Sequence, residues 1–148
     1  MSDILNIRKM QEFDIEEVVK WETKLFSHSL GYDYLLKEIK ENPIANYFVL
    51  ELNNEFIGYM GTWSSVPNGQ IVNFFILPKY QKKGYGSHFL DYIFEFFMTQ
   101  LINVITLEVR VSNKIAQKVY RKKGFISSFI RENYYPNGED AILMIKYL

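Results

Sequence analysis

Residues 81–87 read QKKGYGS, so concentrated positive charge runs into two glycines just before an apolar helical pattern. The first N–H groups of a helix are unpaired and carry a partial positive charge, which attracts anions. Gly84 and Gly86 have no side chain to hold a ligand away from the backbone, and Lys82 and Lys83 add positive charge. Together these residue types could form a cradle for a pyrophosphate.

Spacing alone leaves a second interpretation open, in which this stretch is a lysine-bearing surface turn leading into a core helix. A Walker A loop ends in Gly-Lys-Ser/Thr, whereas this loop continues Gly-Tyr-Gly-Ser-His. The dinucleotide-binding fingerprint needs a third glycine, and Phe89 stands at that place. The pattern by itself favours the ordinary turn over a phosphate site.

The composition is that of a folded chain with balanced charge. It has 148 residues, with 17 Lys plus Arg against 17 Asp plus Glu, and 48% hydrophobic residues. This length predicts a single domain over residues 1–148. Neutrality argues against nucleic acid as the main partner, because phosphate backbones attract strongly basic surfaces.

The absence of cysteine excludes disulfides, cysteine-based zinc sites and a thiolate nucleophile, and it suits the cytoplasm. His28 and His88 lack ligand-like companions, so we expect no metal site. The most apolar region, residues 88–109, is interrupted by Asp91 and Glu95 and predicts a helix and a strand instead of a membrane span.

Hydrophobic periodicity predicts an α/β chain in the order strand, two helices, three strands, helix, strand, helix, two strands. Asp14, with Glu17 in a capping box, is expected to cap the first helix, and Asn113 the last. Asn137 and Gly138 predict a turn between the final strands. The helices are expected over residues 12–26, 31–42, from the glycine loop to about 99, and 114–123. The strands are expected over residues 4–10, 46–52, 55–65, 70–77, 103–111, 125–133 and 141–148.

Two motifs resemble those of the GCN5-related N-acetyltransferases, the GNAT superfamily. Residues 74–90 resemble the family's Gln/Arg-x-x-Gly-x-Gly/Ala loop, with the glutamine at Gln81. Residues 113–125 resemble its Asn-x-x-Ala-x-x-x-Tyr-x-x-x-Gly-Phe motif, which includes Tyr120. The resemblance implies a mixed, mostly antiparallel twisted sheet of about seven strands with about four helices, in which the fourth and fifth strands splay.

A narrower resemblance is to the RimI-type enzymes, which acetylate the N-terminal alanine of small-subunit ribosomal protein eighteen. They carry a Leu-Glu-Val-Arg strand and a Tyr-Tyr-Pro…Glu-Asp-Ala hairpin, similar to residues 107–110 and 134–141. The chain departs from them at residues 25–32, LFSHSLGY, where these enzymes have a Phe-Pro-Trp segment that helps to shape the substrate groove.

The resemblance implies direct acetyl transfer to an amine in a ternary complex, without a covalent enzyme intermediate. Glu108 matches the general base and Tyr120 the general acid that protonates the coenzyme A thiolate. Taken alone, Glu108 could equally be a solvated strand charge or a partner of Arg110, since strand alternation puts both on one face. Tyr120 could equally be one core or rim tyrosine among 11.

The resemblance also implies an acetyl-CoA site in which the pantetheine pairs with the fourth strand and the N–H of Ile76 stabilises the oxyanion. The implied cofactor-binding residues are Phe74, Phe75, Ile76, Gln81, Lys82, Lys83, Gly84, Tyr85, Gly86, Ser87, Asn113 and Tyr120. Tyr134 and Tyr135 would hold the acceptor's N-terminus, and Glu139 and Asp140 would attract a basic peptide.

Three functions remain open at this level. The first is acetylation of a protein N-terminus by a cytoplasmic enzyme whose partners are acetyl-CoA and a ribosomal protein, with no nucleic acid or membrane partner. The second is acetylation of a small amine, a polyamine or a lysine side chain. The third is a non-catalytic acetyl-CoA-binding module. We expect a monomer or a weak homo-oligomer.

Overall fold

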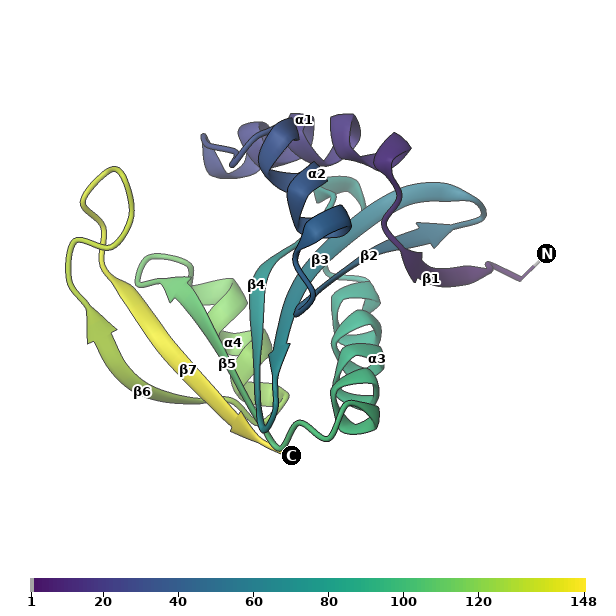
Figure 1. Ribbon diagram of the computed structural model, residues 1–148. Helices are drawn as coiled ribbons and strands as arrows, with labels where there is room; N and C mark the ends of the chain where they lie inside the picture. The colour runs from purple at the N-terminus through teal and green to yellow at the C-terminus, as the bar shows by residue number, and fades with distance from the viewer. Residues whose placement is uncertain (1) are drawn as a thin grey trace. The chain divides into compact units, whose positions relative to one another are not determined.

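The computed structural model describes residues 2–148, and its elements follow the order that the sequence predicts (Figure 1). The strands are β1 (Leu5–Lys9), β2 (Ala45–Leu52), β3 (Glu55–Ser65), β4 (Asn68–Ile76), β5 (Val104–Arg110), β6 (Ile126–Arg131) and β7 (Ala141–Tyr147). The α-helices are α1 (Ile15–Phe26), α2 (Tyr32–Glu41), α3 (Tyr85–Thr99) and α4 (Lys114–Lys122). Two short 3-10 turns, η1 (Glu12–Asp14) and η2 (Pro78–Tyr80), precede α1 and α3.

The strands form one mixed sheet in the order β1-β2-β3-β4-β5-β7-β6. Pairing is antiparallel for β1–β2, β2–β3, β5–β7 and β6–β7, and parallel for β4–β5. The parallel pairing covers Asn68–Gln70 and Val104–Thr106, a short part of each strand. The predicted fold class, a mixed and mostly antiparallel sheet of seven strands with four helices, is confirmed.

The chain divides into two compact units, each of which is described by itself. The first unit contains Met1–Trp63 and Asn73–Gly86, and the second contains Ser64–Val72 and Ser87–Leu148. The expectation of a single domain over residues 1–148 stays a prediction.

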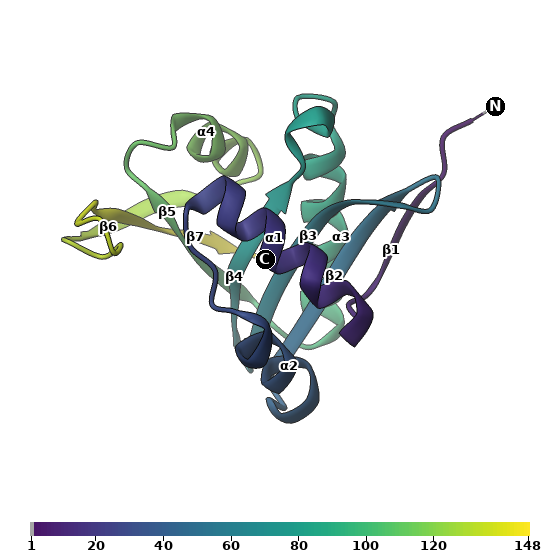
Figure 2. The same cartoon turned by 90° about the horizontal axis from the view of Figure 1, so that it is seen from above.

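In the first unit, α1 and α2 lie on the same side of β2 and β3 (Figures 1 and 2). Ile15, Val18 and Leu35 are buried on these helices, at the helical spacing that the sequence shows. The ring of Phe75 on β4 lies 5.2 Å from that of Tyr59 on β3, so aromatic packing accompanies the backbone pairing. Asn53 and Asn54, with φ of 51° and 68°, make the predicted tight turn between β2 and β3.

The predicted capping of α1 by Asp14 and Glu17 is wrong. Asp14 makes no side-chain cap for α1. Its carboxylate instead accepts two hydrogen bonds from Arg8, at 2.7 and 2.8 Å, and one from the N–H of Gln11 at 2.8 Å. Arg8 comes from β1, and its bidentate ion pair takes up the oxygens that a cap would need. Glu17 accepts from the indole of Trp21.

In the second unit, α3 buries one face and β5 alternates between buried and half-buried residues. Gly69 is required by packing, since a Cβ there would lie 2.7 Å from the ring of Phe97. Asn113 caps α4 as predicted, accepting a hydrogen bond from the N–H of Ala116 at 3.1 Å. Every residue of β6, the strand that ends the sheet, is exposed.

Within residues 2–148, none of the helices has both the length and the apolar character needed to cross a membrane.

Candidate active site

The glycine loop lies in the first unit and turns the chain into α3. Residues 81–84 are exposed, and α3 begins at Tyr85, so the N–H groups of its first turn face the loop. Gly84 has a φ of +89°, and a Cβ built there would meet nothing within 4 Å. A glycine is therefore needed for the backbone conformation, and the space beside it is open. An open turn with flanking Lys82 and Lys83 fits a pyrophosphate.

The adjoining part of β4 has one edge paired and the other occupied by side chains. The N–H of Leu77 donates to the carbonyl of Ile57 on β3 at 2.8 Å. The backbone groups of Phe74 and Ile76 point to the opposite edge of the strand. There the N–H of Phe74 donates to Oδ1 of Asn73 at 2.9 Å, and the carbonyl of Ile76 accepts from Nε2 of Gln81 at 2.8 Å. Gln81 thus ties the glycine loop to the strand that is expected to carry the pantetheine.

A buried carboxylate, which sequence reasoning missed, fixes the segment between α1 and α2. Glu22 is 2% exposed and accepts from the hydroxyl of Ser29 at 2.8 Å and from the amide of Asn73. Burial raises the pKa of Glu22 above its ordinary value, and these two hydrogen bonds oppose that rise. Residues 25–32, where the sequence differs from the RimI-type enzymes, are therefore anchored through Ser29. Its signal in the sequence is a glutamate inside the apolar stripe of α1.

A second buried carboxylate anchors α2 to the sheet. Glu38 is 7% exposed. Its Oε1 accepts from the hydroxyl of Tyr47 and from Nε1 of Trp63, both at 2.7 Å. Its Oε2 accepts from the amide of Asn42, also at 2.7 Å. Three short charge-assisted hydrogen bonds satisfy this buried charge and join α2 to β2 and β3.

Glu108 lies on β5 in the second unit, with a side chain that is 13% exposed. Its Oε1 lies 3.3 Å from Nε of Arg131 on β6. Its Oε2 is buried and has no hydrogen-bond donor among the described residues. The alternative pairing with Arg110 is wrong, since Arg110 pairs with Glu139 at 3.0 Å. A carboxylate oxygen that is buried and free of donors can accept a proton.

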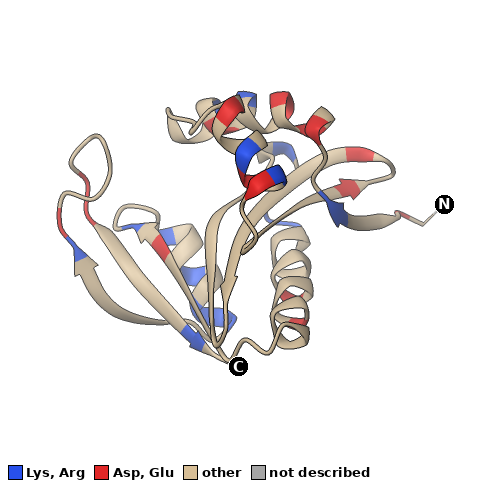
Figure 3. Ribbon diagram, in the orientation of Figure 1, with Lys and Arg blue, Asp and Glu red and all other residues tan. Residues whose placement is uncertain are grey.

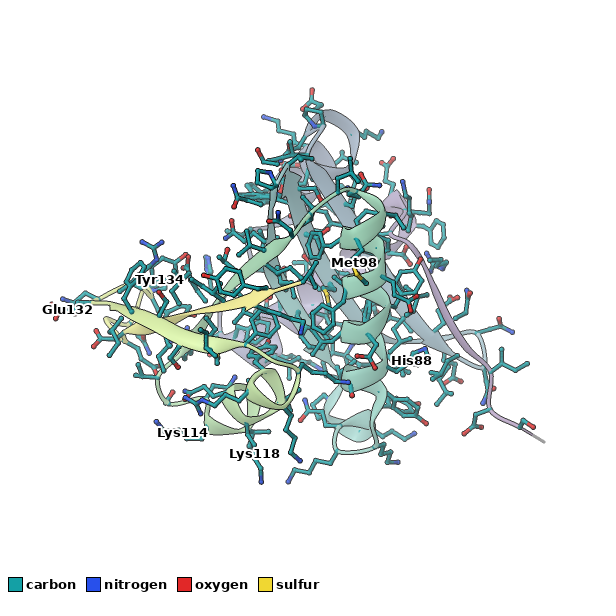
Figure 4. The ribbon with its side chains drawn as sticks, turned by 90° about the horizontal axis from the view of Figure 1, so that it is seen from below. His88, Met98, Lys114, Lys118, Glu132 and Tyr134 are labelled. Atoms are coloured by element: carbon teal, nitrogen blue, oxygen red, sulfur yellow. The ribbon has the colours of Figure 1, made fainter. Side chains whose placement is uncertain are left out.

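Two tyrosines of the β6–β7 loop lie beside this carboxylate, and Figure 4 shows Tyr134 at the end of the hairpin. The pKa of Tyr134 is raised to about 12, first by the neighbouring carboxylate of Glu108 and then by burial. The rings of Tyr134 and Tyr135 are 5.0 Å apart and perpendicular. Burial raises the pKa of Tyr135 to about 12. Both phenols therefore stay neutral near physiological pH.

The acidic residues of this loop make internal contacts that hold its shape. Glu139 accepts from Arg110 and from the N–H of Ser112, and the guanidinium of Arg110 lies 4.0 Å from the ring centre of Tyr135. Asp140 accepts from the N–H of Asn133 at 2.9 Å. The predicted turn at Asn137 and Gly138 is present, with a φ of +86° at Gly138. Figure 3 shows the basic end of β6 next to these acidic segments.

Tyr120 lies in the last turns of α4 and is 9% exposed. Its ring packs edge-on against Phe125 at 5.7 Å. Burial raises the pKa of Tyr120 well above that of a free phenol, and the nearby Tyr135 adds to the effect. The side chain is therefore a neutral hydrogen-bond donor. The side chain of Asn113 is committed to its helix cap.

The predicted site residues fall into two groups, one in each unit. The first unit brings together the cofactor residues Phe74, Phe75, Ile76, Gln81, Lys82, Lys83, Gly84, Tyr85 and Gly86. The second unit contains Ser87, Glu108, Asn113, Tyr120, Tyr134, Tyr135, Glu139 and Asp140. Within it, Glu108 lies beside Tyr134 and Tyr135, and Arg131 joins them as a residue that the sequence did not single out.

Comparison with known proteins supports the resemblance to the acetyltransferases. The sequence matches the acetyltransferase (GNAT) family over residues 10–125. A Bacillus subtilis protein with the provisional name [ribosomal protein bS18]-alanine N-acetyltransferase is 37% identical over 139 residues, covering 93% of this chain and 92% of that protein. An N-alpha-acetyltransferase of Sulfurisphaera tokodaii is 30% identical, covering 93% and 90%.

The fold agrees as well. The crystal structure of the ribosomal-protein-S18-alanine N-acetyltransferase from Escherichia coli superposes with a TM-score of 0.87 at 24% identity, covering 97% of this chain and 94% of that one. The family match spans most of the sequence, and the bacterial and archaeal relatives are N-acetyltransferases by name. The chain therefore belongs to the GNAT family of acetyltransferases and is an acetyl-CoA-dependent N-acetyltransferase.

Proposed function

We propose that this enzyme acetylates the α-amine of protein N-termini, with the N-terminal alanine of ribosomal protein bS18 as its acceptor. The names of its relatives support this acceptor class. The observation that carries the chemistry is the buried, donor-free Oε2 of Glu108 beside the tyrosines of the β6–β7 loop. A base in that position suits an amine that must lose a proton.

The reaction is a direct transfer. The amine nitrogen bonds to the thioester carbonyl carbon, the carbon–sulfur bond breaks, and the amine proton passes to Glu108, directly or through one water. The N–H of Ile76 would stabilise the developing oxyanion. Near neutral pH, a larger fraction of an α-amine, with a pKa of about 8, is uncharged than of a lysine side chain, with a pKa of about 10.4. A protein N-terminus is therefore the more reactive acceptor.

Tyr120 is proposed to donate a hydrogen bond or a proton to the departing thiolate. We expect Tyr120→Phe to lower kcat by about ten- to a hundredfold, because the ring stays packed against Phe125 while the donor is lost. Steady-state kinetics would measure this, with the acetyl-CoA Kd as a control that should not change. An unchanged kcat would assign thiolate protonation to water.

Acetyl-CoA is proposed to bind through the glycine loop and the β4 edge. We expect Gly84→Ala to raise the acetyl-CoA Kd by about tenfold, because a Cβ at a φ of +89° costs about 1–2 kcal/mol and displaces the loop's N–H groups. Isothermal titration calorimetry would measure the affinity. Gly31→Ala is the matched control, with a φ of +94° and the same open space. Equal Kd changes in both variants would argue for general strain instead of a phosphate contact.

The acceptor peptide is proposed to lie against Tyr134 and Tyr135, with Glu139 and Asp140 contributing negative potential. Because both carboxylates hold the loop, their effect on a peptide is best tested by varying the peptide's charge. We expect a lower KM for a peptide with two arginines after its first residues than for the same peptide with two glutamines. Equal KM values would leave these acids with a purely structural role.

Mass spectrometry of two peptides tests the proposed function directly. One peptide begins with the alanine of the ribosomal target, and the other has its α-amine blocked and carries an internal lysine. Acetylation of the first alone supports the proposal. Acetylation of the lysine peptide alone, or of a polyamine in preference to both, would overturn the acceptor class while leaving the family assignment intact.

A further inference from the structure

Arg131 is held in a defined position beside the proposed base. Its Nε lies 3.3 Å from Oε1 of Glu108, and its guanidinium carbon lies 5.0 Å from the ring centre of Phe129. The arginine side chain is 43% exposed, whereas that of Glu108 is 13% exposed. An arginine that stacks on an aromatic ring and pairs with a carboxylate keeps its charge at one place.

The other groups around Glu108 do not offset this charge. Tyr134 and Tyr135 face the carboxylate and are neutral, since their pKa values are raised to about 12. Arg110, on the same face of β5, is neutralised by Glu139. Leu143 lies opposite Glu108 on β7. Glu108 and Arg131 together thus form a pair with no net charge at the donor-free oxygen.

We infer that Arg131 is a specificity residue, which makes the site bind the acceptor as an uncharged amine and so disfavours lysine side chains. This inference rests on the proposed role of Glu108 in N-terminal acetylation. A bound ammonium would meet the guanidinium as well as the carboxylate, and the two interactions largely cancel. An uncharged amine meets no such repulsion.

The ordinary pKa values of the two amines convert this preference into selectivity. At pH 7.5 roughly a quarter of an α-amine with a pKa near 8 is uncharged, but only about one part in a thousand of a lysine with a pKa near 10.4. A site that admits only the uncharged form therefore favours the α-amine by about two hundredfold before any other contact acts. Without Arg131, Glu108 would attract the ammonium and could deprotonate it in place.

The test compares Arg131→Gln and Arg131→Lys with the unaltered enzyme. The control is Lys118→Gln, which removes an equal charge from the exposed face of α4, where Lys118 points away from the helix (Figure 4). kcat/KM is measured from pH 6.5 to 9.5 for the N-terminal peptide and for the blocked lysine peptide. Thermal melts verify that each variant is folded.

We expect Arg131→Gln to lower the selectivity for the N-terminal peptide by about tenfold, through a gain with lysine. Its rising pH limb for the N-terminal peptide should also move to lower pH. Arg131→Lys keeps the positive charge on which the inference depends, so it should retain the selectivity within about twofold. Lys118→Gln should match the unaltered enzyme.

Two results would overturn the inference. One is an Arg131→Gln enzyme with unchanged selectivity and an unchanged pH profile. The other is an Arg131→Lys enzyme that loses selectivity as completely as Arg131→Gln, since geometry and not charge would then be responsible. An unaltered enzyme that acetylates lysine and not the α-amine is a different outcome, because it refutes the proposed function itself.

Discussion

Replacing Glu108 with glutamine is expected to lower kcat/KM for the N-terminal peptide by about a thousandfold. Glutamine keeps the size of the side chain and an oxygen that can face Arg131, but it cannot take a proton from the amine. A stopped or continuous assay of free thiol release would measure the loss. The acetyl-CoA Kd should stay the same.

Glu132→Gln is the matched control. Glu132 is exposed at the start of the β6–β7 loop (Figure 4), and among the described residues it makes no hydrogen bond with Glu108. Its activity should equal that of the unaltered enzyme. A Glu108→Gln enzyme that keeps more than a tenth of its activity, with the same pH dependence, would show that the proton leaves by another route.

Replacing Glu38 with alanine is expected to lower the free energy of unfolding by about 4 kcal/mol. The change leaves the hydroxyl of Tyr47, the indole of Trp63 and the amide of Asn42 without their acceptor, and the site is buried. A domain of this size loses about 2–4 °C of melting temperature per kcal/mol, so Tm should fall by roughly 10 °C. Chemical denaturation would give the free energy.

Glu38→Gln separates the hydrogen bonds from the space that the side chain fills. Glutamine can keep the oxygen that faces Tyr47 and Trp63, but its amide NH2 group would face the NH2 group of Asn42, so its effect should be intermediate. Glu41→Ala, on the exposed end of the same helix, should change Tm by no more than about 1 °C. A Glu38→Ala protein within 1 kcal/mol of the original would mean that the three donors find other acceptors.

The elements of the fold could be predicted because their signals are local. Apolar periodicity placed the helices and strands, and the turns at Asn53 and Gly138 follow from backbone conformations that favour such residues. Asp14 was misjudged because its partner, Arg8, lies on another element. A local capping pattern cannot reveal that a closer cation competes for the same oxygens.

Family motifs in the sequence single out the glycine loop and Glu108 as candidate site residues, and their roles stay predictions. The sequence does not show which side chains from different strands and helices form ion pairs or hydrogen bonds. Arg131 is 23 residues from Glu108 along the chain. β5 and β6 both pair with β7, and this brings the two side chains close enough to form an ion pair. The place of Glu22 in the apolar stripe of α1 indicates burial, but the sequence does not show which donors on the strands reach Glu22 and Glu38.

The exposed strand β6 has a bearing on how the enzyme and its variants can be handled. It ends the sheet, its outer backbone groups are a template for another chain, and Ile126, Phe129 and Ile130 are 59, 49 and 57% exposed. Arg131 supplies the one charge in the strand's sequence, ISSFIR. Charged residues on edge strands oppose edge-to-edge aggregation, so we expect Arg131, which is also proposed to select between amines, to keep β6 from pairing with another molecule. Glutamine at this position therefore calls for dilute storage, whereas lysine retains the protection.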